Sequence, residues 1–192
     1  GLANGDIDVD MESWHSNFRD VYDKHISSGE ILDLGKNLPD GPQGWYVPRY
    51  VIEGDAERGI EAMAPDLNSA EDLKKYWELF RDPEDKNKGL IYLGITGWAI
   101  TEANVEQYEE YGLEPYYNTA IPGSSAAVAA TMDGAYRKGE PWVGYWWEPT
   151  AIMGRLDMVR IPGTEFPPAD VNILVNSELP ETAPDVVAFL EN

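Results

Sequence analysis

Residues 89–112, GLIYLGITGWAITEANVEQYEEYG, carry the clearest indication of the fold. Its first seven residues are a short apolar run, which is typical of a buried strand. Residues 101–112 predict a helix that ends at Gly112, because glycine readily adopts the left-handed conformation that closes many helices. A strand that passes through a short turn into a helix is the building unit of α/β proteins.

The same alternation continues on both sides of this unit. Apolar or alternating patterns predict strands over residues 5–14, 141–147 and 169–176. Capping signals and apolar spacing predict helices over residues 68–82, 124–139 and 182–192, the last with Thr182 as its N-cap. The alternation predicts an α/β fold with a mostly parallel sheet.

Two further segments have interpretable patterns. In residues 68–82 the apolar side chains of Leu73, Tyr76, Trp77 and Phe80 follow a helical spacing, which assigns Trp77 to the core rather than to a ligand. Residues 36–52 are rich in turn formers before they become extended, and they predict a connection to a new structural unit.

Composition excludes several classes of function. The net charge is −21, so nucleic acid and anionic membrane surfaces would be repelled, whereas a secreted protein in salty surroundings would tolerate such a charge. The chain has no cysteine and only two histidines, which leaves few residues for metal binding or nucleophilic catalysis. No apolar run reaches the roughly 18 residues of a membrane span. We expect no cofactor, no metal and no catalytic residue.

One acidic pattern invites a metal-site interpretation. The strand of residues 5–14 carries four carboxylates on one face, and they are Asp6, Asp8, Asp10 and Glu12. The spacing lacks the Asx-Gly loop of a calcium site, so we interpret this face as a solvated one.

Three tryptophans stand where predicted strands end: Trp14, Trp98 and Trp147. In α/β folds ligands collect at the carboxyl ends of strands, so these three rings could converge on one cleft. Strand alternation places Trp146 on the opposite face from Trp147. A tryptophan at a strand end can also be ordinary core packing, or a platform for a sugar.

The turn of residues 97–100 adds a second feature beside the aromatic rings. It opens a helix, and the backbone N–H groups at a helix start suit a carboxylate. Aromatic faces attract quaternary ammonium groups through cation–π interaction. A cage for a cation beside an anion-binding helix start predicts a site for a zwitterion.

Four segments resemble one protein family, and they are GDIDVDMESW (5–14), GITGWAITEANVEQYEEYGLEPY (94–116), SSAAVAATMDGAYRKGEPWVGYWWEPT (124–150) and RLDMVRIP (155–162). The sequence is similar to the glycine betaine/proline-betaine substrate-binding proteins of ABC transporters, in order from about residue 4 to about residue 175. The resemblance implies a type II periplasmic-binding-protein fold with two α/β lobes around a cleft. It also implies a quaternary ammonium osmolyte as ligand, a membrane permease as partner, and a periplasmic or cell-surface location.

The resemblance also implies roles for individual residues. The family's tryptophan box matches Trp14, Trp98 and Trp147, and its carboxylate-binding amides match Ala99 and Ile100.

Related proteins carry a histidine four or five residues after the first box tryptophan, where this chain has Phe18 and Arg19. Arg19 or Asn17 could bind the carboxylate instead, whereas His15 would point elsewhere in an extended segment. Glu148 stands where many relatives have threonine. It is either a solvated carboxylate or a residue that favours choline or trimethylamine N-oxide.

The resemblance divides the chain into part of lobe 1 (1–45), lobe 2 (46–165) and a return to lobe 1 (166–192). The family's opening strand–helix–strand unit has no counterpart ahead of residue 5, so we expect a complete second lobe and a partial first lobe. Apolar residues there would lack cover, and they are Ile7, Val9, Met11, Ile173, Leu174 and Val175. We therefore expect this form to self-associate, to exchange elements with a second copy or to require a separate piece.

Two alternatives come from other classes of protein. A glycoside hydrolase could use Glu12 and Glu148 as paired carboxylates among aromatic platforms. A carbohydrate-binding module could use the exposed tryptophans for stacking. We favour a binding protein that performs no chemistry.

Overall fold

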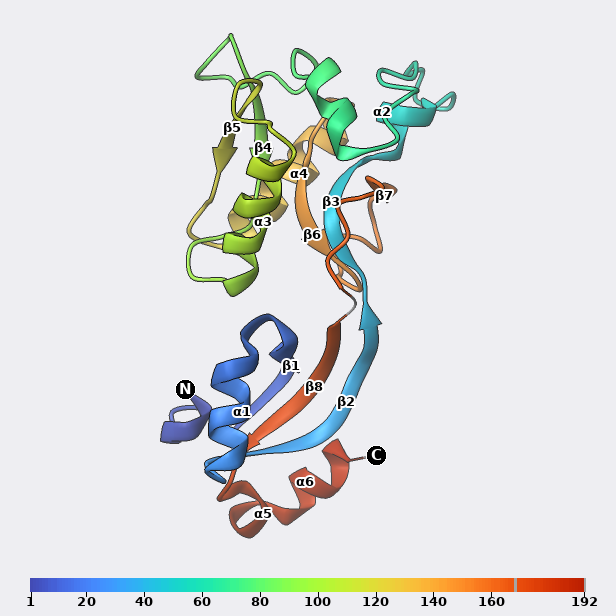
Figure 1. The fold of residues 1–192 in the computed structure, drawn as a ribbon. Helices are drawn as coiled ribbons and strands as arrows, with labels where there is room; N and C mark the ends of the chain where they lie inside the picture. The colour runs from blue at the N-terminus through green and yellow to red at the C-terminus, as the bar shows by residue number, and fades with distance from the viewer. Residues whose placement is uncertain (168, 192) are drawn as a thin grey trace. The chain divides into compact units, whose positions relative to one another are not determined.

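The computed structural model describes residues 1–167 and 169–191 (Figure 1). The chain forms two compact units, one made of Gly1–Gly41 with Pro168–Asn192 and the other of Pro42–Pro167. Trp14 therefore belongs to the first unit, whereas Trp98 and Trp147 belong to the second.

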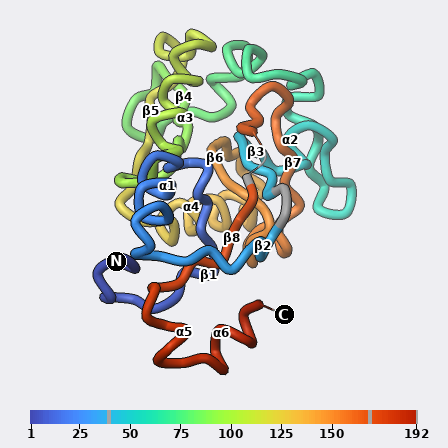
Figure 2. Tube along the Cα trace, turned by 60° about the horizontal axis from the view of Figure 1, so that its bottom comes forward, coloured from blue at the N-terminus to red at the C-terminus, as the bar shows by residue number. Residues whose placement is uncertain are grey.

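The first unit is built on a three-stranded antiparallel sheet of order β1-β8-β2. Its elements are η1 (Leu2–Asn4), β1 (Val9–Ser13), η2 (His15–Phe18), α1 (Arg19–Ser27), β2 (Ile31–Gly41), β8 (Ala169–Asn176), α5 (Leu179–Thr182) and α6 (Pro184–Leu190). The short helices α5 and α6 follow β8 as a pair at the C-terminal end of the chain (Figures 1 and 2).

The cover of this sheet differs from the sequence expectation. β8 lies between β1 and β2, and its residues Ile173, Leu174 and Val175 are buried. Ile173 and Val175 form a small core with Leu179 and Val187, from the two C-terminal helices. The prediction that residues 173–175 lack cover is therefore wrong, because the last two helices cover Ile173 and Val175, and Leu174 is buried as well.

At β1, an edge strand of the same sheet, apolar side chains are exposed. Ile7 and Met11 are each 49% exposed, and β1 pairs with β8 along one side. Apolar side chains at the β1 edge of the sheet thus remain in contact with solvent.

The second unit contains a five-stranded sheet of order β5-β4-β6-β3-β7. Its elements are β3 (Gln43–Pro48), α2 (Arg49–Glu53), η3 (Ala70–Lys75), β4 (Gly89–Tyr92), α3 (Ala99–Glu110), β5 (Tyr117–Ala120), α4 (Ser125–Lys138), β6 (Gly144–Trp147) and β7 (Met158–Arg160). β4 runs parallel to β5 and β6, whereas β3 runs antiparallel to β6 and β7. By strand pairing, the prediction of a mostly parallel sheet is wrong: β4 pairs in parallel with β5 and β6, whereas the other pairs of the two sheets (β3–β6, β3–β7, β1–β8 and β2–β8) are antiparallel.

Alternating side chains divide the core of this unit between the two faces of the sheet. On β6, Tyr145 belongs to the cluster beneath α3, whereas Trp146 belongs to the cluster beneath α4. The neighbouring strand β3 repeats the pattern with Trp45 and Tyr46. The predicted alternation is confirmed for Tyr145 and Trp146. The prediction that Trp146 and Trp147 lie on opposite faces is wrong, because Trp147, at the end of the strand, stacks on Trp146 and packs against both clusters.

The predicted helix of residues 68–82 is only the single 3₁₀ segment η3. The Leu73 carbonyl oxygen accepts a hydrogen bond from the Tyr76 N–H at 3.0 Å and another from the Tyr117 hydroxyl at 2.8 Å. An α-helix would use that carbonyl for Trp77, so the tertiary contact with Tyr117 competes with helix propagation. Trp77 still packs against the core, as predicted.

Two other local predictions are corrected. Residues 36–41, predicted to be rich in turns, are instead the end of the strand β2. The pairing of β2 with β8 shifts register at three places, which accommodates these residues. Thr182 does not cap the last helix, because its hydroxyl donates back to the Glu178 carbonyl at 3.0 Å and Ala183 takes the N-cap position.

Candidate functional site

The two tryptophans of the second unit form a right-angled aromatic corner. The ring centroids of Trp98 and Trp147 lie 5.1 Å apart with an interplanar angle of 81°. Trp147 is the last residue of β6, and Trp98 immediately precedes α3. Both side chains are half-buried, so each retains some surface for a ligand.

Neighbouring rings support this corner from behind. Trp147 stacks on the buried ring of Trp146 at 4.5 Å, and Trp98 meets the buried ring of Tyr145 at 6.5 Å in an edge contact. The Tyr145 hydroxyl donates to Gln43 Oε1 at 2.7 Å, and burial raises the pKa of Tyr145. The sequence did not reveal these supports as such, although the alternation of the strand placed Tyr145 and Trp146 on opposite faces.

The start of α3 lies directly beside the corner, because Trp98 is its N-cap residue. No side chain caps this helix, in contrast to α4, where the Ser124 hydroxyl accepts from the Ala127 N–H at 3.2 Å. The N–H groups of Ala99 and Ile100 precede the first hydrogen bond of a regular helix and point out of its positive end. This arrangement suits a carboxylate next to Trp98.

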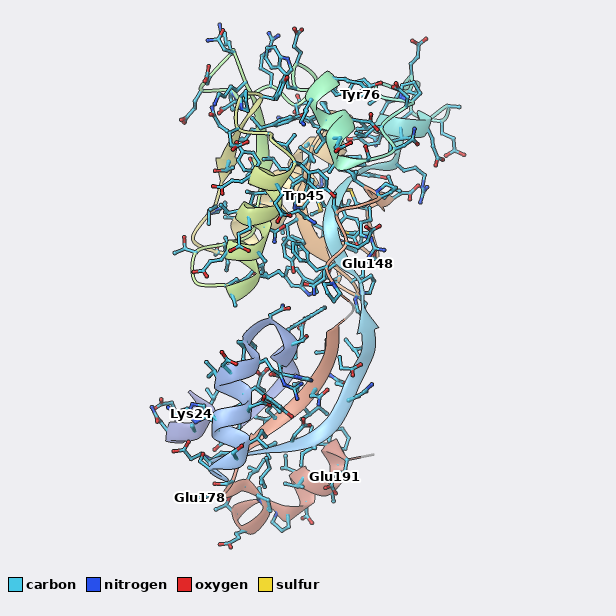
Figure 3. The ribbon with its side chains drawn as sticks, in the orientation of Figure 1. Lys24, Trp45, Tyr76, Glu148, Glu178 and Glu191 are labelled. Carbon is cyan, nitrogen blue, oxygen red and sulfur yellow. The ribbon has the colours of Figure 1, made fainter. Side chains whose placement is uncertain are left out.

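The Glu148 carboxylate is hydrogen-bonded to a residue on the sheet face that α4 covers, not on the face that α3 covers. Its Oε1 accepts a hydrogen bond from the Tyr46 hydroxyl at 2.9 Å. Figure 3 labels Glu148 on the ribbon. Burial, with the nearby Glu148 carboxylate, raises the pKa of Tyr46. Tyr46 belongs to the cluster beneath α4, whereas Trp98 packs on the cluster beneath α3.

In the first unit, Trp14 stands between β1 and η2. Its side chain is half-buried, and its indole Nε1 donates to Glu12 Oε1 at 3.2 Å. The Asn17 N–H donates to the Trp14 carbonyl at 2.9 Å and closes the turn after it.

Arg19 and His15 are both held by α1. Arg19 pairs with Asp23 at 3.1 Å, and its guanidinium lies 5.5 Å from the centre of the Tyr22 ring. His15 is buried, and its ring stacks on the Tyr22 ring with 4.6 Å between the ring centroids. His15 sits in a 3₁₀ segment rather than in the extended segment that the sequence suggested.

A polar network centred on Asp33 was not visible in the sequence. Asp33 accepts hydrogen bonds from the Tyr22 hydroxyl at 2.5 Å, the Asn172 amide at 2.6 Å and the Gly35 N–H at 2.7 Å. Partial burial alone would raise the pKa of Asp33, but these hydrogen bonds outweigh it and lower the pKa below its usual value. The local sequence around Asp33 carries no motif that signals this network.

Residues 1–167 and 169–191 lack two other features. No group of three or more His, Asp or Glu side chains there could hold a metal ion. Over the same residues, no helix has the length and apolar character needed to cross a membrane. The two carboxylates considered for hydrolysis, Glu12 and Glu148, belong to different units.

The α/β fold of two units is that of the type II periplasmic binding proteins, as the solved structures below show. Residues 1–192 match a family described as the substrate binding domain of ABC-type glycine betaine transport system, and the chain belongs to that family. No match is found among the curated proteins.

Three solved structures are similar to this chain. The glycine/betaine/L-proline-binding protein ProX from Borrelia burgdorferi is 24% identical, covers 99% of this chain and 64% of its own length, and gives a TM-score of 0.65. Lactococcal OpuAC, closed and complexed with glycine betaine, is 22% identical over 100% of this chain and 66% of its own, with a TM-score of 0.68. An ABC-transporter choline binding protein in complex with choline is 18% identical, and the match covers 100% of this chain and 62% of that protein, with a TM-score of 0.66. The chain thus spans a little under two thirds of these relatives.

Proposed function

We propose that this protein is the solute-binding component of an ABC importer and that it binds glycine betaine or a related quaternary ammonium osmolyte. The observation that carries the proposal is the perpendicular pair Trp98–Trp147 beside the uncapped start of α3. Membership of the glycine betaine family supports the same conclusion.

The aromatic corner suits the cationic end of such a ligand. A trimethylammonium group donates no hydrogen bond, and its weak hydration makes transfer to an aromatic surface inexpensive. Two rings at 81° present two faces to one cation, and each desolvated contact contributes about 1–2 kcal/mol. Trp14 is the third candidate ring, and family resemblance alone assigns it.

The helix start suits the anionic end. The N–H groups of Ala99 and Ile100 would donate to the ligand carboxylate, helped by the positive end of the helix dipole. Arg19 and Asn17 remain the proposed side-chain partners of that carboxylate. Arg19 would have to exchange its surface pair with Asp23, which costs little in water.

Choline and trimethylamine N-oxide are the alternative ligands of the same site. Choline lacks the carboxylate that the α3 amides would bind, so those two N–H groups would gain no anionic acceptor from it. Glu148, the residue that could favour choline, already accepts a hydrogen bond from Tyr46. We therefore propose glycine betaine ahead of choline.

The remaining parts of the proposal concern partners and place. The importer's membrane permease would receive the ligand, and the protein would work in the periplasm or at the outer cell surface. We also propose self-association through the β1 edge, supported by the exposed side chains of Ile7 and Met11.

We further propose that the protein performs no chemistry. A retaining or inverting hydrolase needs one carboxylic acid and one carboxylate facing the same bond. Here Glu12 accepts a hydrogen bond from Trp14 and Glu148 accepts one from Tyr46, so each carboxylate already has a local structural role.

A thermal-shift panel tests the function against its alternatives. We expect glycine betaine to raise the melting temperature, since a ligand that binds the folded state stabilises it. Choline and trimethylamine N-oxide should raise it less, and oligosaccharides should leave it unchanged. A double variant, Trp98→Ala with Trp147→Ala, is the control that should remove the glycine betaine shift. An oligosaccharide shift without a betaine shift would replace the proposal with a carbohydrate-binding function.

A further inference from the structure

Asn104 is a fully buried polar side chain in the middle of α3. It is 0% exposed, and both ends of its amide are hydrogen-bonded. Its Oδ1 accepts from the Trp45 indole Nε1 at 2.6 Å, and its Nδ2 donates to the Ile100 carbonyl at 2.9 Å. A buried amide whose oxygen and nitrogen both have hydrogen-bond partners favours one arrangement of the groups around it.

The position of this bond relates it to the aromatic corner. Trp45 lies on β3, which pairs directly with β6, the strand that ends at Trp147 (Figure 3). Asn104 lies on the helix that begins after Trp98. The Trp45–Asn104 hydrogen bond therefore ties the helix that carries one wall of the corner to the sheet that carries the other.

Other hydrogen bonds of α3 act elsewhere. The Thr101 hydroxyl donates to the Ile95 carbonyl at 2.8 Å and holds the turn before the helix. The Tyr108 hydroxyl donates to the Tyr117 carbonyl at 2.6 Å and holds the far half of the helix on β5. The side-chain hydrogen bonds of Asn104 and Tyr108 both join α3 to a strand, and the Asn104 bond is the nearer to Trp98 along the chain.

We propose that Asn104 is a positioning residue that sets the distance and angle between Trp98 and Trp147 through its hydrogen bond with Trp45. The proposal rests on the proposed function for its effect on the ligand. Asn104 also binds the carbonyl of Ile100, so it orders the peptide unit beside the amides that would receive the carboxylate. It acts through these groups and does not touch the ligand.

The second unit offers a matched control bond. The Trp142 indole Nε1 donates to the Thr131 hydroxyl at 3.1 Å, which ties α4 to the segment before β6. Trp142 is buried in the cluster beneath α4, on the other side of the sheet from Trp98. It is the same kind of indole-to-helix hydrogen bond, but it ties α4 rather than α3 to the sheet.

Three variants separate positioning from stability. Asn104→Leu leaves the buried Trp45 N–H without a partner and should lower the melting temperature by roughly 2–12 °C. The double variant Trp45→Phe with Asn104→Leu removes both partners, and much of that loss should return because no polar group is stranded. Trp142→Phe with Thr131→Val is the control.

Two properties are measured for each variant. One is the affinity for glycine betaine by calorimetry. The other is the set of tryptophan indole N–H signals in the NMR spectrum of the ligand-free protein, assigned with single Trp→Phe variants. The second readout needs no ligand, so it judges the positioning role even if the protein binds no betaine and the proposed function fails.

We expect the Trp45→Phe/Asn104→Leu variant to regain stability, yet to bind glycine betaine at least about tenfold more weakly, with shifted or broadened signals for Trp98 and Trp147. The control variant should keep its affinity and the Trp98 signal, because Trp142 lies in the cluster that contacts Trp147 but not Trp98. Recovery of stability, affinity and unshifted indole signals together would overturn the proposal. If the double variant does not fold, Trp45→Phe alone is measured in the same way, and unchanged Trp98 and Trp147 signals there would overturn it as well.

Discussion

Replacement of Trp98 by alanine is the perturbation with the most direct consequence for the aromatic corner. The change removes one of two rings whose centroids lie 5.1 Å apart. A desolvated cation–π contact of about 1–2 kcal/mol corresponds to roughly a 5- to 30-fold change in Kd. Loss of the edge contact with Tyr145 should also lower stability, because Trp98 packs partly against that core.

Isothermal titration calorimetry with glycine betaine measures this prediction. Trp98→Ala and Trp147→Ala should each weaken binding about tenfold, and Trp98→Phe should fall between the wild type and the alanine variant. Trp77→Phe is the matched control, because Trp77 is also half-buried against the same core cluster. It should lower the melting temperature and leave the affinity within about twofold of the wild type. Equal losses of affinity at all three tryptophans would refute the assignment of the corner.

Three further predictions concern charge and assembly. The net charge of −21 repels itself in the compact state, so the melting temperature should rise as NaCl increases, and a flat or falling response would contradict this. Lys75, the Ser69 hydroxyl and the Asn68 N–H lower the pKa of Asp72 to about 2. Because that pKa is depressed in the folded state, the stabilisation is present above about pH 4 and is lost as the pH falls toward 2. Asp72→Asn should therefore melt below the wild type at pH 7, with a gap that closes between about pH 4 and 2, whereas a constant gap would argue against it. Light scattering should show self-association that Ile7→Lys and Met11→Lys reduce, and a stable wild-type monomer with full betaine affinity would refute that expectation.

The parts of the fold that the sequence predicted are those where local pattern and tertiary environment agree. The helix that begins after Trp98 and the one closed by Gly139 both have continuous helical sequence and a capping or closing residue. Strand alternation correctly separated Trp146 from Tyr145, because both faces of that strand are buried.

The missed parts depend on contacts distant in sequence. Residues 70–80 have helical spacing, but the hydroxyl of Tyr117 competes for the Leu73 carbonyl that would continue the helix. Residues 31–41 contain turn formers, yet pairing with β8 holds them extended with register shifts. Neither partner can be inferred from the local sequence.

The candidate site divides in the same way. Sequence and resemblance proposed Trp98 and Trp147 as binding residues, and that role stays a prediction. Their perpendicular contact is a property of the folded unit that no pattern specifies. The support from Trp45 and Asn104 was also invisible, since a tryptophan on a strand and an asparagine within a helix carry no signal of a shared hydrogen bond.

Competition calorimetry between glycine betaine and choline tests the central claim most directly. The two ligands share the trimethylammonium group, and only glycine betaine has a carboxylate for the N–H groups of Ala99 and Ile100. Charge-assisted hydrogen bonds contribute about 1.5–3 kcal/mol each, so even one such bond predicts that glycine betaine binds at least about tenfold more tightly. Equal affinities, or a preference for choline, would contradict the account.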